Sequence, residues 1–202
     1  MAHRPRTEMI AETRAKLVRA ARHAFGTVGY AAASMDDFTA AAGLTRGALY
    51  HHFGDKKGLL QAVIAEIDGE MNARLKQIAG RAETPWKRFV AESLAYLEMT
   101  LEPEIQRIVL RDGPSVLGDP AGWDSQLECI ASMTGALRDL IAVGVMKPVD
   151  PEATARLLNG ATVQAAQWIA HAPDPDAAAR HAIQALEAML SGLLLPGAAE
   201  NA

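Results

Sequence analysis

The chain has 202 residues, 50% of them hydrophobic, with a formal net charge of −4 and a single cysteine, Cys129. A chain of this length and composition can bury a sizeable core, which excludes global disorder. The lone cysteine excludes an internal disulfide, and no apolar run approaches the roughly 18 residues of a membrane span. The N-terminus carries no apolar signal segment, so we expect a soluble, cytoplasmic protein.

Charge is spread unevenly along the chain. Residues 1–60 contain nine Lys or Arg and five Asp or Glu, whereas the remainder contains eleven and nineteen. A basic segment on an acidic body suggests that the segment binds a polyanion and that the body does not. Chance clustering on an ordinary surface would give the same balance, so charge alone does not show that the segment binds a polyanion.

Helical spacing of apolar residues along most of the chain predicts an all-α fold. The first helix is expected over residues 8–26, where Gly26 and Gly29 supply stop signals. Alternation of β-branched or aromatic residues is nearly absent, so a sheet is not expected.

Two short helices are predicted next. Ser34 begins a capping box for a helix that ends at Gly43, and Thr45 caps a following helix that runs through about His52. Only a few residues separate the two helices, and the turn contains glycine. This is the sequence form of a helix-turn-helix.

The rest of the chain reads as longer helices. Asp55 is expected to cap a fourth helix, whose apolar residues keep helical spacing to Ile78. Prolines divide the remainder into further expected helices, at 85–101, 103–112, 122–145, 151–171 and 175–194. The segment RDGPSVLGDPAG, residues 111–122, is the main expected loop.

The segment GLTRGALYHHFGDKKGLL, residues 43–60, concentrates cationic and aromatic side chains. With Leu44 and Leu49 packed inward, we expect Thr45, Arg46, Tyr50 and His51 near the outer face of their helix. Arg46 can read a guanine edge or bind phosphate, and the two hydroxyl groups can donate to phosphate oxygens.

Lys56 and Lys57 fall in the first turn of the fourth helix. Cations there oppose the helix macrodipole, at a cost of about 0.3–1 kcal/mol each. A phosphate bound at this helix end would turn that cost into a gain, because the backbone N–H groups and the lysines would both attract it. The alternative is two solvated lysines at negligible cost.

Residues 8 to about 65 resemble the TetR family of transcriptional regulators. The resemblance rests on AFGTVGY (24–30) and SMDDFTAAAGLTRGALYHHFGDKKGLL (34–60). The matching positions, in order and spacing, are Gly43, Leu44, Thr45, Gly47, Leu49, Tyr50, Phe53, Lys56 and Leu59. One departure is Thr39, where the family usually has alanine; Thr39 is expected either to crowd the helix pair slightly or to bond back through its hydroxyl to the carbonyl one turn earlier.

The resemblance implies an all-helical homodimer, with a DNA-binding domain at 1–54 and a ligand-binding and dimerisation domain at 55–202. It also implies a double-stranded operator as partner, a small-molecule effector, and most often repression. Carried onto this chain, phosphate contacts fall to Ser34, Thr45, Tyr50 and Lys56, and base contacts to Arg46, Gly47 and His51.

The body contains large apolar side chains with a few polar ones among them, which suits a small, largely apolar effector. The alternative is that each simply belongs to the core. The candidate ligand-binding residues are Trp86, Phe89, Tyr96, Met99, Trp123, Gln126, Leu127, Met133, Gln164 and Trp168.

The last two expected helices, 151–171 and 175–194, each carry an apolar stripe mixed with small residues. Two subunits could bury these stripes in a four-helix interface. The alternative is that both stripes face their own domain.

Two other functions compete with the regulator. For an enzyme, His51 and His52 are adjacent and make a poor metal pair, Cys129 has no nearby histidine, and no nucleophile elbow, P-loop or dinucleotide motif is present. We therefore expect no catalytic activity, metal or cofactor. An architectural DNA-binding protein that ignores ligands is the second alternative. The sequence leaves the effector, the operator and the choice between repression and activation open.

Overall fold

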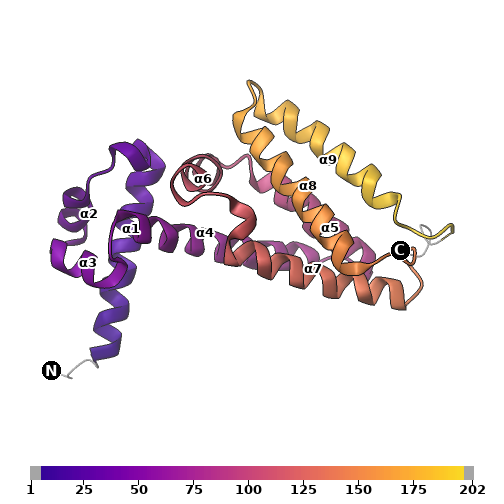
Figure 1. The fold of residues 1–202 in the computed structure, drawn as a ribbon, viewed down its shortest axis with the longest axis horizontal. Helices are drawn as coiled ribbons and strands as arrows, with labels where there is room; N and C mark the ends of the chain where they lie inside the picture. Colours follow the sequence, from indigo (N-terminus) through magenta and orange to yellow (C-terminus); the bar gives the residue numbers. More distant parts are fainter. Residues whose placement is uncertain (1–5, 198–202) are drawn as a thin grey trace. The chain divides into compact units, whose positions relative to one another are not determined.

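A computed structural model describes residues 6–197, and α-helices make up nearly all of their regular structure (Figure 1). The predicted all-α fold is confirmed. By packing, the chain forms two compact units, here called the head and the body. The head comprises the chain up to Ile67 together with Arg107–Gly118, and the body comprises Asp68–Gln106 and the chain from Asp119.

The division by packing differs from the boundary expected between residues 54 and 55. It falls inside helix α4 (Lys56–Ala79), whose first half belongs to the head and whose second half belongs to the body. A segment from the middle of the chain also belongs to the head, which a boundary drawn at one point along the sequence could not describe.

The head is built from α1 (Arg6–Ala32), α2 (Met35–Ala42), α3 (Arg46–Phe53) and the start of α4. Its core consists of side chains that are at most 1% exposed, including Leu17, Phe25, Phe38, Leu49 and Leu59. The rings of Phe25 and Phe38 meet edge to face, with 5.3 Å between their centres. This core holds the two short helices against α1.

Helix α1 extends past the predicted end at residue 26, because Gly26 continues the helix. Gly29 interrupts the helical geometry, with φ 83° and ψ 165°, and a new turn follows to Ala32. A side chain here would be strained, because L residues rarely adopt this positive φ, and its Cβ would displace the guanidinium of Arg107, which would stand only 2.6 Å away. The kink therefore combines a backbone conformation that favours glycine with a close approach.

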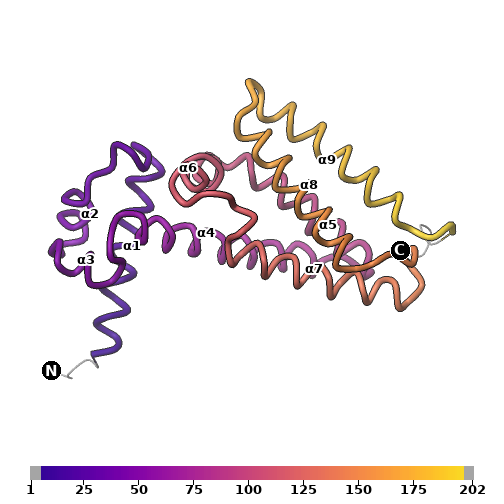
Figure 2. The backbone as a smooth tube through the Cα atoms, viewed as in Figure 1, coloured from indigo at the N-terminus to yellow at the C-terminus, as the bar shows by residue number. Residues whose placement is uncertain are grey.

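The helix-turn-helix forms as predicted. The Ser34 hydroxyl accepts from the N–H of Asp36 at 3.2 Å, and the Thr45 hydroxyl accepts from the N–H of Ala48 at 3.3 Å. Gly43 adopts a left-handed conformation, with φ 65°, and turns the chain from α2 into α3 (Figure 2).

The predicted back-bonding of Thr39 is confirmed. Its hydroxyl donates to the carbonyls of Met35 and Asp36, at 3.2 and 3.0 Å, and its side chain is buried. The extra hydroxyl is therefore satisfied within α2.

The body packs α5 (Pro85–Met99), α7 (Asp124–Ala142), α8 (Pro151–His171) and α9 (Pro175–Ser191) around one core; α8 lies against α7 and α9 (Figure 1). Three of these helices begin with proline directly after a capping Thr84, Asp150 or Asp174. Within the described residues, no helix combines the length and apolar character needed to cross a bilayer.

The expected loop at 111–122 was wrong in part. A π-helical segment, Ile105–Asp112, leads into the short helix α6 (Gly113–Leu117), and a single 3-10 turn follows at Pro120–Gly122. The prolines explain the error. We took Pro114 and Pro120 as helix breakers, but both stand in the first turn of a helix, where proline is well tolerated.

Candidate DNA interface and candidate ligand cavity

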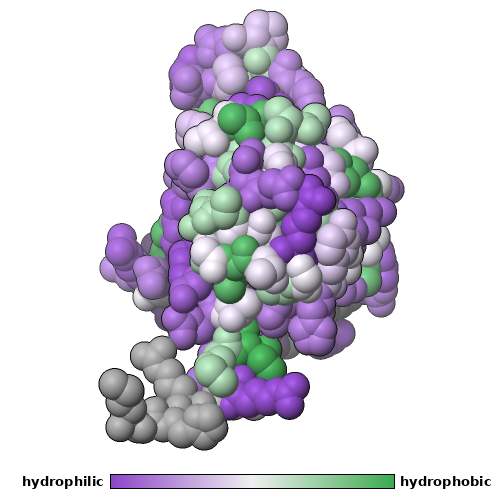
Figure 3. All heavy atoms as spheres, turned by 90° about the vertical axis from the view of Figure 1, so that its left-hand side faces the viewer, coloured by the Kyte–Doolittle hydropathy of each residue, from purple (hydrophilic) through white to green (hydrophobic). Residues whose placement is uncertain are grey.

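The candidate DNA interface is the outer face of α3. Thr45, Arg46, Gly47, Tyr50 and His51 are all exposed along this helix, with 51% of the Tyr50 surface accessible. Figure 3 views this side of the protein, where hydrophilic residues surround scattered hydrophobic ones instead of a continuous apolar patch. The remaining two predicted contacts are half-buried: Ser34 caps the start of α2, and Lys56 is the first residue of α4.

The two capping hydroxyls can serve a second purpose. In each cap, the oxygen of Ser34 or Thr45 accepts a backbone N–H. A hydroxyl that accepts in this way keeps its own hydrogen available for donation. Both groups can therefore hold their helices and still donate to a phosphate oxygen.

Arg46 forms an ion pair that sequence reasoning missed. Both its Nε and one of its terminal nitrogens donate to the two carboxylate oxygens of Asp36 on α2. The side chains are 58% and 63% exposed, so the pair adds little to stability. Its effect is geometric: the guanidinium is held in one place at the start of α3.

Lys56 is held against the end of α1. Its ammonium lies 4.4 Å from the centre of the Tyr30 ring and 3.4 Å from the carbonyl oxygen of Ala31. Burial lowers the pKa of Lys56, and the charge of Asp112 opposes this shift. The same Asp112 carboxylate accepts a hydrogen bond from the backbone N–H of Tyr30 at 2.8 Å.

A cavity of about 220 Å³ lies within the body. One water molecule needs roughly 10–15 Å³, so the cavity has room for a small organic molecule. Its walls are single faces of four helices, α4, α5, α7 and α8. They include Asp68, Met71, Asn72, Leu75 and Lys76 from α4, Phe89, Glu92, Ser93 and Tyr96 from α5, Ser125, Gln126, Glu128, Cys129, Ser132, Met133 and Ala136 from α7, and Asn159 and Thr162 from α8.

Four of the residues predicted for ligand binding line this cavity: Phe89, Tyr96, Gln126 and Met133. The other six lie in other parts of the body, outside the cavity. Trp86 and Met99 belong to the core, Trp123 is half-buried with its indole N–H unpartnered among the described residues, and Leu127, Gln164 and Trp168 are exposed. Large apolar size alone did not distinguish a wall from a core position.

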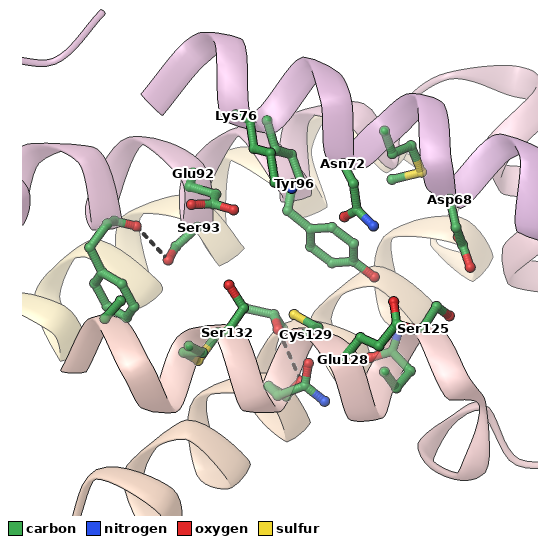
Figure 4. A pocket seen from close by; sticks show the side chains of 18 residues that line it. Asp68, Asn72, Lys76, Glu92, Ser93, Tyr96, Ser125, Glu128, Cys129 and Ser132 are labelled. Carbon is green, nitrogen blue, oxygen red and sulfur yellow. Dashed lines mark hydrogen bonds between the residues drawn. The ribbon is translucent and has the colours of Figure 1, made fainter. Parts of the chain in front are cut away.

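The cavity is more polar than predicted, and its polar groups are spread along its length. Figure 4 shows Asp68 and Ser125 at one end, Glu92 and Ser93 at the other, and the Tyr96 side chain between them. Burial raises the pKa of Asp68, and a hydrogen bond with Ser125 opposes that shift. Burial, followed by the charge of Asp68, raises the pKa of Tyr96. Across the described residues, no group of three His, Cys, Asp or Glu side chains could hold a metal ion.

A shallow apolar groove lies between α8 and α9. It is lined by Ala161, Ala165, Trp168, Ala185 and Met189, among others. Trp168 and Met189 are 49% and 54% exposed. The predicted stripes are split: the chain buries Leu158, Ile169, Leu186 and Leu190 in its own core and leaves Leu157, Trp168 and Met189 exposed.

A helix-turn-helix with an exposed second helix, followed by a helical body with a cavity between its helices, defines a class of DNA-binding regulators with a small-molecule site. Comparison with known proteins gives the family. Residues 17–63 match the family described as bacterial regulatory proteins, tetR family, and residues 86–193 match the family described as tetracyclin repressor-like, C-terminal domain.

Three relatives illustrate the likeness. A TetR-family transcriptional regulator of Pectobacterium atrosepticum is 53% identical, with a TM-score of 0.86, and the match covers 95% of this chain and 98% of that one. The transcriptional repressor KstR2 of Mycolicibacterium smegmatis is 24% identical over 78% of this chain and 80% of its own length. SmeT, the repressor of a multidrug efflux pump of Stenotrophomonas maltophilia, shares the fold, at 21% identity and a TM-score of 0.72 over 93% of this chain and 94% of that one.

The chain belongs to the TetR family of transcriptional regulators. The predicted family is therefore confirmed, and the chain functions in the regulation of transcription.

Proposed function

We propose that this chain is a ligand-responsive repressor that binds a palindromic operator as a dimer and is released by a small molecule in the body cavity. The observation that carries the proposal is the course of α4. Its first half supplies Leu59, Leu60 and Val63 to the core of the head, and its second half supplies Asp68, Met71 and Asn72 to the cavity wall. A single continuous helix therefore takes part in both sites.

DNA binding is assigned to α3 and the two helix starts beside it. We assign base contacts to Arg46, Gly47 and His51, which are exposed, and phosphate contacts to the hydroxyls of Ser34, Thr45 and Tyr50, of which Ser34 is half-buried and the other two are exposed. Lys56 completes the set at the first residue of α4. Phosphate contacts fix the register of the head on the duplex, while Arg46 and His51 supply base discrimination.

Dimerisation is assigned to the exposed side of α8 and α9. Leu157 is 75% exposed, and Trp168 and Met189 flank a groove whose other walls are mostly alanine. Small residues beside large apolar ones let helices from two subunits approach closely. A pair of heads is needed because one short recognition helix contacts too few base pairs to select a site in a genome.

Coupling between the cavity and DNA binding is assigned to the three chain connections between body and head. One is α4, and the other two are the ends of the 107–118 segment, which joins the head at Arg107 and returns to the body at Asp119. A ligand alters operator affinity only if it binds the DNA-competent and the incompetent arrangement unequally. A difference of about 1–3 kcal/mol changes the affinity 5- to 150-fold.

The relatives support the ligand assignment. KstR2 and SmeT are repressors, and SmeT has been solved as a complex with triclosan. By this analogy the cavity binds an effector and does not catalyse a reaction, and the protein acts in the cytoplasm, where it meets its operator.

The proposal is tested by selecting genomic DNA fragments on the purified protein and sequencing those retained. We expect an inverted repeat to be enriched. We also expect compounds that raise the melting temperature of the protein to release the protein from this DNA. Binding without sequence preference, unaffected by any compound that stabilises the protein, would favour an architectural role instead.

A further inference from the structure

The ends of the cavity differ in charge. Three carboxylates, Asp68, Glu92 and Glu128, face a single cation, Lys76. Lys76 lies at the Glu92 end, whereas Asp68 and Ser125 lie at the opposite end (Figure 4). No ion pair joins these four charged groups to each other or to another residue of the part of the chain that the structure describes. The Asp68 end therefore carries negative charge that the chain itself leaves uncompensated.

Asp68 is half-buried on the cavity face of α4, and its partner within the chain is the neutral hydroxyl of Ser125. The Tyr96 hydroxyl points toward this end (Figure 4). Because burial already raises the pKa of Asp68, the carboxylate lies where water compensates its charge poorly. A cationic ligand group would supply that compensation.

A second, independent feature comes from α8. Asn159 lines the cavity with only 7% of its surface exposed, and its side-chain amide makes no hydrogen bond to another residue of the described chain. The neighbouring buried polar residue, Thr162, differs: its hydroxyl donates to the carbonyls of Leu158 and Asn159. The Asn159 amide can therefore pair with a polar group on a molecule bound in the cavity.

Apolar side chains lie among these polar groups. Met71, Leu75, Phe89, Met133 and Ala136 line the cavity together with the Tyr96 ring. Aromatic faces attract cations, and methionine side chains adapt to irregular apolar bodies. The cavity therefore combines one anionic end, one unpaired amide and a long apolar surface.

We propose that the cavity takes a small amphipathic amine, whose protonated nitrogen is held by the Asp68 carboxylate and whose apolar body lies along Tyr96 toward Phe89. The inference rests on the proposed function, in which this cavity binds the effector, and names the chemical class of that effector. Glu128 adds negative charge near the Asp68 end, and Asn159 pairs with a further polar atom of the ligand.

The test compares three probes of similar shape and different charge: phenylbutylamine, phenylbutanol and phenylbutyrate. Binding to the free protein is measured by calorimetry, without DNA. We expect the amine to bind at least about tenfold more tightly than the alcohol, because only the amine pairs with the carboxylate, and phenylbutyrate to bind weakest. Asp68→Asn should abolish the preference for the amine and leave the alcohol unchanged.

Two further variants make the result specific. Glu128→Gln should weaken binding of the amine by a smaller factor than Asp68→Asn. This variant still tests the role of the carboxylates if Asp68→Asn is poorly folded. Glu98→Gln removes an exposed carboxylate of α5 outside the cavity and should change nothing. Equal affinities for amine and alcohol, tighter binding of the carboxylate, or no binding of the amine would overturn the assignment. Operator release by a neutral or anionic probe would, in that case, leave the proposed function standing.

Discussion

The Asp112 carboxylate accepts a hydrogen bond from the backbone N–H of Tyr30, although 82 positions separate the two residues. The kink at Gly29 creates the need for this bond. The residue after the kink begins a new helical turn, and first-turn N–H groups have no carbonyl partner within their helix. A carboxylate at that position also suits the helix dipole. The contact fastens the 107–118 segment to the end of α1.

Asp112→Ala should therefore loosen this attachment. The unpartnered N–H should lower the free energy of unfolding by about 1–2 kcal/mol and speed amide hydrogen exchange at Tyr30. Hydrogen exchange read by NMR measures the local effect. Asp139→Ala, at an exposed aspartate of α7, is the matched control and should leave the Tyr30 amide as it is. Unchanged exchange at Tyr30 in Asp112→Ala would show that the contact does not hold the segment.

Substitutions of the two members of the Arg46–Asp36 pair should have opposite effects on DNA affinity. Arg46→Ala should cost about 1–3 kcal/mol of operator affinity and relax the base preference at one position of each half-site. Asp36→Asn keeps the arginine but releases it, and removes a negative charge near the DNA. It should strengthen binding to unrelated DNA and lower the ratio of specific to unrelated affinity. Anisotropy titrations on both DNAs measure this ratio; a ratio unaltered by either variant would refute the role of the pair.

Lys56→Ala should weaken binding to all duplexes by a similar factor, because a phosphate contact carries no sequence information. The slope of log affinity against log salt should become shallower by about one unit per lost contact. Lys87→Ala, at an exposed lysine of the body, should leave the slope unchanged. An equal slope for the wild type and Lys56→Ala would place Lys56 off the DNA.

Met189→Asp and Leu157→Asp should convert the proposed dimer into a monomer, since each puts a charge on an exposed apolar position of α8 or α9. Sedimentation gives the mass. Leu186 is a poor choice for the same test, because it is buried in the body core and a charge there would unfold the chain. Val143→Asp, 66% exposed at the end of α7, is the control. A dimer that survives both α8 and α9 substitutions is held by another surface.

Asp68→Asn should stabilise the ligand-free protein at neutral pH. Burial raises the pKa of Asp68 in the folded state, so the ionised carboxylate opposes folding at any pH above that value. The cost fades as the pH falls through the raised pKa and is gone below the ordinary aspartate value of about 4. The melting temperature of the variant should therefore exceed that of the wild type at pH 7, and the gap should close on acidification. A gap that widens in acid would contradict this sign.

Much of the fold could be predicted from local signals. Caps and stop residues such as Ser34, Gly43 and Thr45 act over a few residues, so the helix-turn-helix boundaries followed from the sequence. The 107–118 segment could not be placed in this way. Its attachment depends on the Asp112 carboxylate meeting the Tyr30 N–H, beside the kink at Gly29, across a long stretch of chain, and no periodicity in either segment signals that contact.

The cavity was predicted only in part for a related reason. Large apolar residues occupy cores as readily as cavity walls, so their presence in the sequence does not locate a cavity. The polar residues carried a usable signal: Asp68, Asn72 and Lys76 repeat at helical spacing on α4, and Glu92 and Ser93 share a face of α5 with Tyr96. Polar groups on an otherwise inward-facing stripe mark a wall more reliably than aromatic size does. The Arg46–Asp36 pair joins two helices, and only the geometry of the turn brings it together.

Hydroxyl-radical footprinting on the selected operator tests the central claim most directly, since it reports where the paired recognition helices contact the duplex. Two protected patches should appear, related by two-fold symmetry and separated by one helical turn or a multiple of it, about 10–10.5 base pairs each. Both patches should fade together in Arg46→Ala and on addition of a releasing ligand. A single patch, or protection that ignores Arg46 and the ligand alike, would contradict a dimeric, ligand-responsive regulator that reads DNA through α3.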